Sequence, residues 1–428
     1  MRCILLLIDG LADVTQSALD GHTPLETAVT PALDEAARNG RVGTIAPLNT
    51  GSPSSLPNLL ALLGYPSGRA ASARGWFEAL GLGLSIAPNE WAWRLQFVTL
   101  SDGRIVDPSP AALRAEETGE LLSALGAALQ PLGWRLVEGA ANSHLAISAH
   151  DFTGVETTSP WDAQDKDLKS VLPRGRHAGP LASLIEKAQA VLEGHEINRV
   201  RLDLRENPAN AAWPWGGGTH IKLTPFHEIH SLDGVLASSS PLARGVSIAA
   251  GLRLAGDPGF VLPLKDPSGR FAAPMTAPAK PSATRPEKSS AKSSADSARP
   301  EFQSLLGVAK AEMEGSSPVI LLHSSAVADA GMSGGPLAKR AAIEMLDEEL
   351  IAPLMALLAG KDARLAVVST VGLDSGRRVN LGGPSPLCVW GNGVSAREHV
   401  TLTEKNVEKA GMKVSQPQQF IEYVLGGL

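Results

Sequence analysis

The 428-residue sequence lacks features that would assign a broad class of protein at once. Its two cysteines, Cys3 and Cys388, are too few and too far apart for a disulfide framework or a cysteine-based zinc site. Both lie in apolar runs, which indicates buried thiols in a reducing compartment. The 38 Lys and Arg residues are outnumbered by 44 Asp and Glu residues, so the net charge is −6. This balance excludes a nucleic acid or an anionic membrane as the expected partner.

Long apolar runs are absent as well. No stretch approaches the roughly 20 apolar residues of a membrane-spanning helix. The run at residues 3–8 is shorter than the apolar part of a secretory signal, and no small-residue cleavage pattern follows it. We therefore interpret residues 3–8 as a buried strand and expect a soluble, cytoplasmic protein.

The two ends of the chain share one pattern, in which apolar strands alternate with helices. We expect strands at residues 3–8, 41–47, 317–325, 363–370 and 385–391, and helices at 31–40 and 337–360. This alternation predicts an α/β fold with a doubly wound, mostly parallel sheet. The predicted core comprises residues 1–90 and 186–428, and an inserted, smaller α+β domain occupies residues 91–185.

One segment within the core has a different composition. Residues 267–300 are rich in Pro, Ala, Ser and Lys. Such a segment cannot bury enough apolar surface to offset the entropy of ordering it. We predict a disordered linker there.

Several ordered blocks carry a resemblance to a known family. They are "LLIDGLAD" (6–13), "GHTPLETAVTPALDEAARNG" (21–40), "LLALLGYP" (59–66), "ARGWFEALGLGL" (73–84), "ENPANAAWPWGGG" (206–218) and "SSPLARGVSIAAGL" (239–252). Together they resemble the archaeal-type, cofactor-independent phosphoglycerate mutases of the alkaline phosphatase superfamily. The resemblance implies an alkaline-phosphatase-like core with two divalent metal ions, Mn, Mg or Zn, at the carboxyl edge of the sheet. It also implies a serine between the metals that carries the phosphoryl group, whose charge the metals stabilise.

The family's metal ligands are only partly retained. By the resemblance, Asp9 matches the aspartate at the end of the first strand and Ser55 matches the nucleophilic serine, and we expect the two to face each other. The remaining matched ligand positions, where the family has histidines and an aspartate, are occupied by Met332, Val371, Gly372 and Asn380. None of these four is a histidine or a carboxylate, and Met332 offers a thioether where such metals prefer oxygen or nitrogen donors.

Two loop aspartates leave an alternative open. Asp329 and Asp374 could rebuild an oxygen-only site with Asp9 and Ser55. Neither lies at a family ligand position, and a loop aspartate is most often a turn residue or a helix cap.

The positions that bind substrate in the family are also altered. Arg74 is retained, Arg244 stands where the family tends to have a lysine, and His144 has lost the arginine that follows it in the family. An arginine can hold a phosphate or carboxylate with two parallel hydrogen bonds, but it can equally fix a loop.

Two functions from different classes remain. The first is a pseudoenzyme that has kept the fold of this glycolytic family, with Ser55 as a vestigial nucleophile, no cofactor, and a binding or regulatory role toward a small phosphorylated metabolite or a protein. The alternative is an active mutase, or a related phosphotransferase or phosphatase, that uses Ser55 and a relocated divalent metal.

Overall fold

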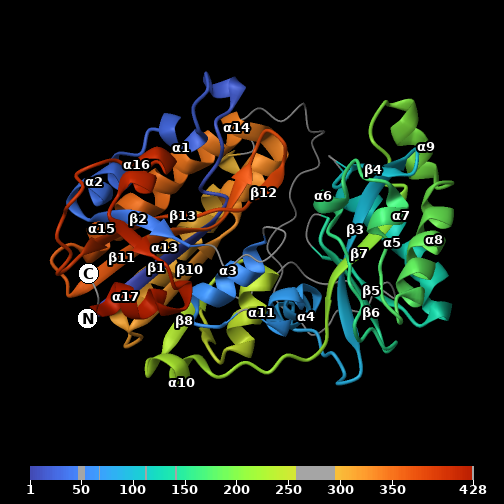
Figure 1. Ribbon diagram of the computed structural model, residues 1–428, viewed down its shortest axis with the longest axis horizontal. Helices are drawn as coiled ribbons and strands as arrows, with labels where there is room; N and C mark the ends of the chain where they lie inside the picture. The colour runs from blue at the N-terminus through green and yellow to red at the C-terminus, as the bar shows by residue number, and fades with distance from the viewer. Residues whose placement is uncertain (47–53, 67, 111–112, 140–141, 257–294, 427–428) are drawn as a thin grey trace. The chain divides into compact units, whose positions relative to one another are not determined.

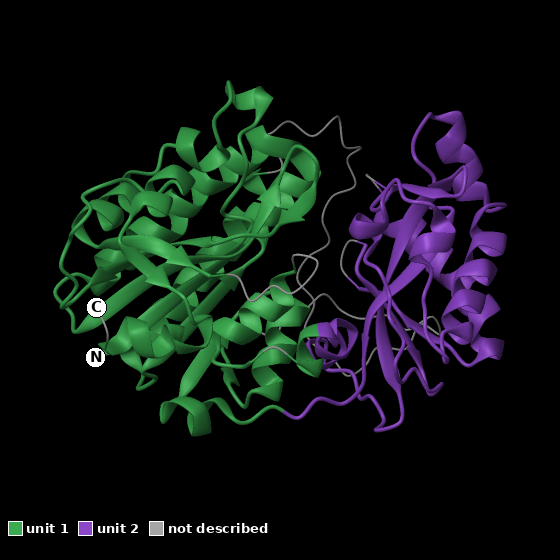
Figure 2. Ribbon diagram, in the orientation of Figure 1, with its two compact units in different colours: residues 1–71, 223–260, 279–428 green, residues 72–222, 261–278 purple. Residues whose placement is uncertain are grey.

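The computed structural model describes residues 1–46, 54–66, 68–110, 113–139, 142–256 and 295–426. These residues form two compact units, which Figure 2 distinguishes by colour. The first unit contains the described parts of 1–71, 223–260 and 279–428, and the second contains those of 72–222. No helix among the described residues is long and apolar enough to cross a membrane.

The first unit is built on a mixed sheet whose strands run in the order β14-β2-β13-β11-β1-β10-β8-β9, with β12 paired to β11 (Figure 1). The strands are β1 (Arg2–Asp9), β2 (Arg41–Ile45), β8 (Gly234–Ala237), β9 (Arg253–Leu254), β10 (Val319–Ser324), β11 (Ala363–Asp374), β12 (Val379–Leu381), β13 (Ser385–Gly391) and β14 (Met412–Val414). The pairs β11–β1, β1–β10, β10–β8 and β8–β9 are parallel, which confirms the predicted mostly parallel α/β sheet.

Both faces of this sheet are buried. Along β1, Ile4, Leu6 and Ile8 join the large apolar cluster that includes residues of α2 (Pro31–Asn39), α13 (Arg299–Glu314), α14 (Ala326–Leu346) and α15 (Ala352–Leu358). The alternate side chains point to the other face, because successive strand residues do, and Cys3 and Leu5 there are also fully buried. A strand buried on both faces reads as a continuous apolar run, which is why the sequence predicted it well.

The helices of the first unit connect these strands. They are α1 (Pro24–Thr27), α2 (Pro31–Asn39), α3 (Ser55–Leu62), α10 (Phe226–His230), α11 (Pro241–Ala249), α13 (Arg299–Glu314), α14 (Ala326–Leu346), α15 (Ala352–Leu358), α16 (Glu404–Lys409) and α17 (Phe420–Gly426), with 3-10 turns η1 (Ser17–Leu19), η2 (Arg69–Ser72, at the boundary) and η6 (Pro417–Gln419). A π-helical segment, η5 (Asp347–Ile351), joins α14 to α15. Within α14, Gly335 has a φ of 72° and interrupts the helical backbone just before Pro336.

The direction of one strand differs from the prediction. Residues 385–391 were expected to lie parallel to their neighbours, but β13 is antiparallel to both β11 and β2. The reason is the connection: β11 turns directly into β12 and then β13 with no helix between them. A parallel pairing needs a crossover of about a dozen residues or more, usually helical, whereas a short connection gives an antiparallel strand.

The second unit has its own antiparallel sheet, ordered β4-β3-β6-β5 with β7 paired to β3. Its strands are β3 (Trp91–Ser101), β4 (Arg104–Asp107), β5 (Arg135–Val137), β6 (His144–Ser148) and β7 (Ala211–Gly218), and its helices are α4 (Arg74–Gly81), α5 (Ala115–Leu129), α6 (Pro160–Ala163), α7 (Leu168–Val171), α8 (Gly179–Leu192) and α9 (Glu196–Asp203), with the 3-10 turn η3 (Gln130–Leu132). An apolar cluster joins the sheet residues Trp93 and Phe97 to Leu121 of α5 and Leu184 of α8.

The boundaries of this unit differ from those predicted for the insert. Residues 72–90 and 186–222 belong to the second unit, not to the core. Strand β7 pairs along β3, and α4 packs on both strands. The sequence did not indicate β7 because "AAWPWGGG" contains a proline and three glycines, which are rare inside strands.

The end of the predicted linker also differs. Most of residues 267–300 lie outside the described residues, but 295–300 are described. Ala295 and Ala298 are buried in the large apolar cluster of the first unit, and α13 begins at Arg299. Residues 295–300 are therefore part of the folded first unit.

Candidate functional site

Polar side chains gather where neighbouring parallel strands end. Strands β8, β10, β1 and β11 are adjacent in the sheet. Ser238 follows the last residue of β8, His323 lies near the end of β10, Asp9 ends β1, and Thr370 lies at the matching level of β11. The carboxyl edge of such a sheet is where α/β proteins hold their ligands.

A chain of polar contacts crosses these strands. The Oγ of Ser238 and the Nδ1 of His323 lie 2.9 Å apart, and the Nε2 of His323 is 3.5 Å from an Asp9 carboxylate oxygen. The Thr370 hydroxyl donates to the other Asp9 oxygen. With Glu301 of α13, we call Ser238, His323, Asp9 and Thr370 the edge cluster.

His323 supplies the positive charge of this cluster. Its side chain is buried, and burial by itself lowers the pKa of an imidazole. The carboxylates of Asp9, Glu301 and Asp329 oppose that effect and raise the pKa of His323 above its ordinary value. The imidazolium form of His323 thus balances the charge of Asp9.

Glu301 reaches the same edge from α13. One of its carboxyl oxygens accepts a hydrogen bond from Ser239 at 3.1 Å, and burial raises its pKa. Its second oxygen, Oε1, is buried and has no hydrogen-bonding partner among the described residues. A buried carboxyl group in such surroundings favours its neutral form.

Ser55 begins α3 near this edge and is 9% exposed. One turn later, the side-chain amide of Asn58 donates to the backbone oxygen of Thr370 at 2.7 Å. Residues three apart share a helix face, so the first turn of α3 meets the strand that contacts Asp9. The direct approach of Ser55 to Asp9 stays a prediction.

The substituted ligand positions lie around these strands as apolar or solvent-facing residues. Val371 is buried in β11, and Gly372 packs so closely that a Cβ there would be 3.1 Å from the Cβ of Leu381. Asn380 is exposed in β12, and Met332 is half-buried on α14 rather than fully in the core. Val371, Gly372 and Met332 offer Mn, Mg or Zn no side-chain oxygen or nitrogen, and the amide oxygen of Asn380 is the one such donor at these four positions.

The two aspartates expected in loops lie in regular elements, Asp329 in the first turn of α14 and Asp374 at the end of β11, and they make separate contacts. Asp329 accepts a hydrogen bond from the Ser325 hydroxyl at 2.8 Å. Asp374 accepts from the backbone N–H groups of Gly376 at 3.1 Å and Arg377 at 3.0 Å, the pattern of an aspartate that stabilises a turn. It also accepts from the amide of Gln16 at 3.2 Å, which places it in a different cluster.

That second cluster surrounds Lys339, which is fully buried. Its Nζ donates to the carboxylate of Asp13 and to the backbone oxygens of Ala12 and Leu373, each at 2.9 Å. Burial lowers the pKa of Lys339. With Gln16, Asp374 and Ser375, which contact Asp13 or each other, we call Lys339 and Asp13 the lysine cluster.

The residues present do not fit the two metals that the resemblance implies. Within the described parts of the chain, no three His, Cys, Asp or Glu side chains are grouped so that they could hold a metal ion. Both carboxylate oxygens of Asp9 already contact protein groups, His323 and Thr370. We therefore derive no chemical step through a metal.

Two substrate candidates, Arg74 and His144, lie in the second unit. The guanidinium groups of Arg74 and Arg94 both bind one oxygen of Glu78, at 2.8 Å and 2.6 Å, and both stack over Trp215. His144 is completely buried, and burial and then the charge of Arg94 lower its pKa to about 3. The ion pairs of Arg74 and the neutral imidazole of His144 fit structural roles.

The third candidate, Arg244, lies in the first unit on α11. This helix begins three residues after Ser238, and Arg244 is half-buried there. Burial lowers the pKa of its guanidinium group, although arginine stays charged at any ordinary pH.

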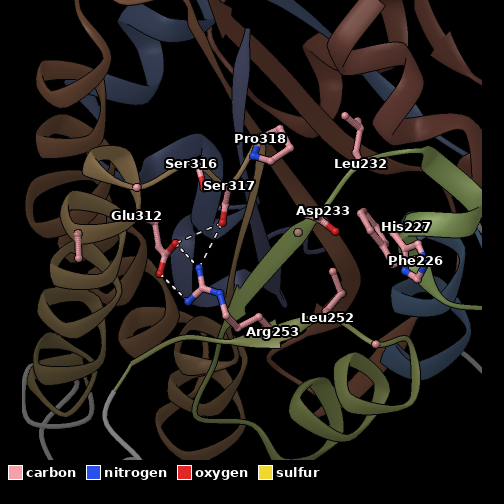
Figure 3. A pocket seen from close by; sticks show the side chains of 14 residues that line it. Phe226, His227, Leu232, Asp233, Leu252, Arg253, Glu312, Ser316, Ser317 and Pro318 are labelled. Carbon is pink, nitrogen blue, oxygen red and sulfur yellow. Dashed lines mark hydrogen bonds and ion pairs between the residues drawn. The ribbon is translucent and has the colours of Figure 1, made fainter.

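A cavity of about 530 Å³ lies at the opposite edge of the first unit's sheet (Figure 3). It is lined by the residues that precede β8 and β10, by Arg253 and by the end of α13. Arg253 and Glu312 form a pair of hydrogen bonds at 3.0 and 2.5 Å in its wall. None of the candidate residues lines this cavity.

The sequence did not single out His323, Ser238 or Lys339. His323 sits inside the apolar run 317–325, and a polar side chain at the end of a predicted parallel strand was the available signal. Lys339 lies four residues before Ile343, on the helix face that buries Ile343 and Leu346, and this spacing was the available signal of its burial.

Comparison with known proteins shows similarity to one family. The sequence profile of 2,3-bisphosphoglycerate-independent phosphoglycerate mutase matches residues 37–198. A protein of that name from Methanothrix thermoacetophila is 28% identical over 432 residues, covering all of both chains. Another from Methanosarcina barkeri is 35% identical over 256 residues, which are 59% of this chain and 64% of the relative.

Solved structures agree on the fold. A protein from Pyrococcus horikoshii has a TM-score of 0.62 at 22% identity and covers 99% of this chain and 96% of its own. The cofactor-independent phosphoglycerate mutase from Thermoplasma acidophilum has a TM-score of 0.51 at 21% identity, with 99% and 98% of the two chains covered. The resemblance seen in the sequence is thereby confirmed for the fold.

Proposed function

We propose that this chain is a divergent member of the family of 2,3-bisphosphoglycerate-independent phosphoglycerate mutases, that it binds a small phosphorylated metabolite, and that it does not transfer the phosphoryl group by the family's metal-dependent reaction. The contact that supports this proposal most strongly is that of Asp9 with His323 and Thr370. At the edge where the resemblance implies a divalent metal, the aspartate is neutralised by an imidazolium group of the protein itself.

The chemical consequence follows from what a metal supplies. Divalent ions stabilise the attacking and leaving oxygens during phosphoryl transfer, a contribution of several kcal/mol. Without a metal or a base in contact, the hydroxyl of Ser55 is a poor nucleophile at neutral pH. A loss of about 4 kcal/mol of stabilisation lowers a rate about a thousandfold.

A binding role is supported by the charges that remain at the carboxyl edge. Arg244 of α11 carries a guanidinium group that can form two parallel hydrogen bonds to a phosphate. His323 adds a second positive charge on the neighbouring strand β10. Both belong to elements that start or end at that edge.

The turnover test compares the wild-type protein with a Ser55→Ala variant. We expect substoichiometric Mn, Mg and Zn in the purified protein by elemental analysis. We also expect conversion of 3-phosphoglycerate, with added Mn or Mg, at least about a thousandfold below that of an active mutase assayed in parallel. Stoichiometric metal together with turnover that Ser55→Ala abolishes would instead establish the relocated site at Asp9, Ser55 and a loop aspartate.

The binding test is separate. We expect 3-phosphoglycerate to raise the melting temperature of the wild-type protein, and Arg244→Met to weaken its binding about tenfold, the loss of roughly one charged hydrogen bond. Arg378→Met is the matched control, because Arg378 is an exposed arginine of the same unit. Equal binding by both variants would remove Arg244 from the proposal.

A further inference from the structure

The cavity of Figure 3 lies at the edge of the sheet opposite the edge cluster, and its role does not depend on the proposed function. Its volume of about 530 Å³ is typical of sites that bind small molecules. All the residues that line it belong to the first unit. We propose that this cavity binds a small organic cation, an amine or amidinium group on an apolar body, with Asp233 as its counter-charge.

The two arginines at this edge of the sheet already have partners. The terminal nitrogens of Arg253 donate to the two carboxylate oxygens of Glu312 at 3.0 Å and 2.5 Å, and one of them also donates to the Ser317 hydroxyl at 3.2 Å. Arg2 donates to two backbone carbonyl oxygens at the carboxyl end of α13. An anionic ligand would have to displace Glu312 from a pair of charge-assisted hydrogen bonds, so these arginines do not favour a phosphate or a carboxylate.

Asp233 is the charge in the lining that has no counter-charge. Its residue is exposed just before β8, and its carboxylate makes no hydrogen bond or ion pair with any described part of the chain. Because Arg253 and Glu312 cancel, the lining carries one net negative charge when His227 is neutral. The cavity therefore attracts a cation and repels an anion.

His227 supplies a second polar contact. It is exposed on α10, and its ring has no hydrogen-bonding partner among the residues that the structure describes. In Figure 3, His227 and Asp233 lie on one side of the cavity, and Arg253 lies on the other. An amidinium group carries several N–H donors, so it can donate to the Asp233 carboxylate and to an imidazole nitrogen at once.

Buried apolar side chains form the inner wall of the cavity. Leu252 and Phe226 are 6% and 1% exposed. Both pack against Gly234, the first residue of β8, where an added Cβ would lie 2.6 Å from the Leu252 Cδ2 and 3.2 Å from the Phe226 Cε1. A ligand that combines an apolar body with a single charged end matches this lining, since most small-molecule sites pair an apolar wall with a few polar groups.

The test is isothermal titration calorimetry of the full chain with three probes of similar shape and different charge. They are benzamidine, which is a cation, benzyl alcohol, which is neutral, and benzoate, which is an anion. We expect benzamidine to bind with a dissociation constant on the order of 1 mM, as its few atoms allow. It should bind at least about tenfold more tightly than either of the other probes.

Two variants locate the binding site. Asp233→Asn keeps the shape of the side chain and removes its charge, and it should weaken benzamidine binding about tenfold or more, the value of one charge-assisted hydrogen bond. Ala311→Trp adds a bulky side chain at an exposed residue that lines the cavity, and it should weaken the binding of benzamidine at least as much.

The matched control is Asp20→Asn, which removes an exposed aspartate of the same unit outside the cavity and should bind benzamidine as the wild type does. Far-ultraviolet circular dichroism checks that each variant is folded. No benzamidine binding, equal affinity for the three probes, or an affinity that neither Asp233→Asn nor Ala311→Trp lowers would overturn the proposal.

Discussion

The two buried polar clusters of the first unit differ in how completely their hydrogen bonds are formed. In the lysine cluster, all three donors of Lys339 are used, and both oxygens of Asp13 accept hydrogen bonds, among others from Gln16 and Ser375. In the edge cluster, Asp9 is partly exposed and the Oε1 of Glu301 has no partner among the described residues.

The difference distinguishes a cluster that stabilises the fold from a cluster whose groups can contact a ligand. A fully satisfied buried network holds the fold in one arrangement, whereas an incompletely satisfied one leaves groups available for a ligand or a proton. Lys339 ties the loop after β1 to the end of β11 through the backbone oxygens of Ala12 and Leu373. The lysine cluster thus fixes the strands that carry the edge cluster, and the edge cluster carries the candidate chemistry.

The strongest test of this comparison is Lys339→Met. The substitution removes three hydrogen bonds and leaves the Asp13 carboxylate buried without its counter-charge. Breaking a buried pair on one side costs about 3–5 kcal/mol. We expect a loss of that size in the free energy of unfolding, measured by urea denaturation followed by circular dichroism.

Three further variants serve as controls: one at an exposed lysine, one in the edge cluster and one that also changes Asp13. Lys405→Met removes an exposed lysine and should change the free energy of unfolding by less than about 0.5 kcal/mol. Ser238→Ala should cost about 1 kcal/mol, the value of one hydrogen bond. Adding Asp13→Asn to Lys339→Met should recover part of the loss, because it removes the unpaired charge. A cost below 1 kcal/mol for Lys339→Met would contradict the structural role of the lysine cluster.

The sequence predicted local features of this sheet better than it predicted the neighbours of each residue. Asp9 ends β1 as expected, because an uninterrupted apolar run marks a buried parallel strand. Ser238 and His323 are 85 residues apart, and only the order β8-β10-β1 brings them together with Asp9. The order of strands in the sheet depends on how the whole core packs. Hydrophobic periodicity along the chain predicts the strands but not their order.

The family's ligand positions illustrate the same limit. The resemblance located the substitutions at Val371 and Asn380, but it could not reveal that His323 and Thr370 contact Asp9 in this chain. Similarly, Asp374 was a candidate ligand by its residue type alone, and its contacts with Gly376 and Arg377 are those of a turn.

A smaller effect is expected where α14 packs on the lysine cluster. A Cβ added at Gly331 would lie 2.8 Å from a Leu373 methyl carbon and 3.2 Å from the Lys339 Cδ. Overpacking costs about 1–3 kcal/mol, against a helix-propensity gain of about 1 kcal/mol for alanine. We expect Gly331→Ala to lower the free energy of unfolding by up to about 2 kcal/mol in urea denaturation.

Gly307→Ala on α13 is the matched control, because a Cβ there would meet nothing within 4 Å. This variant should be more stable than the wild type by about 0.5–1 kcal/mol. If both alanine variants were more stable than the wild type, the space around Gly331 would accept a methyl group, which would contradict the close contacts with Leu373 and Lys339.

The smallest effect concerns the pH dependence that Glu301 gives to the edge cluster. Burial raises the pKa of this carboxyl group above its unfolded value of 4.5. Between the two pKa values the folded protein holds a proton that the unfolded chain has released, so the free energy of unfolding falls as the pH rises through that window. Each unit of difference corresponds to about 1.4 kcal/mol. We expect Glu301→Gln to reduce this fall in urea denaturation between about pH 4 and pH 8, because Asp347, Glu404 and His323, whose pKa values are also raised, supply the rest of it. Glu348→Gln, at an exposed site, should leave the fall unchanged. An equal fall in Glu301→Gln and in the wild type would show that Glu301 does not contribute to the pH dependence.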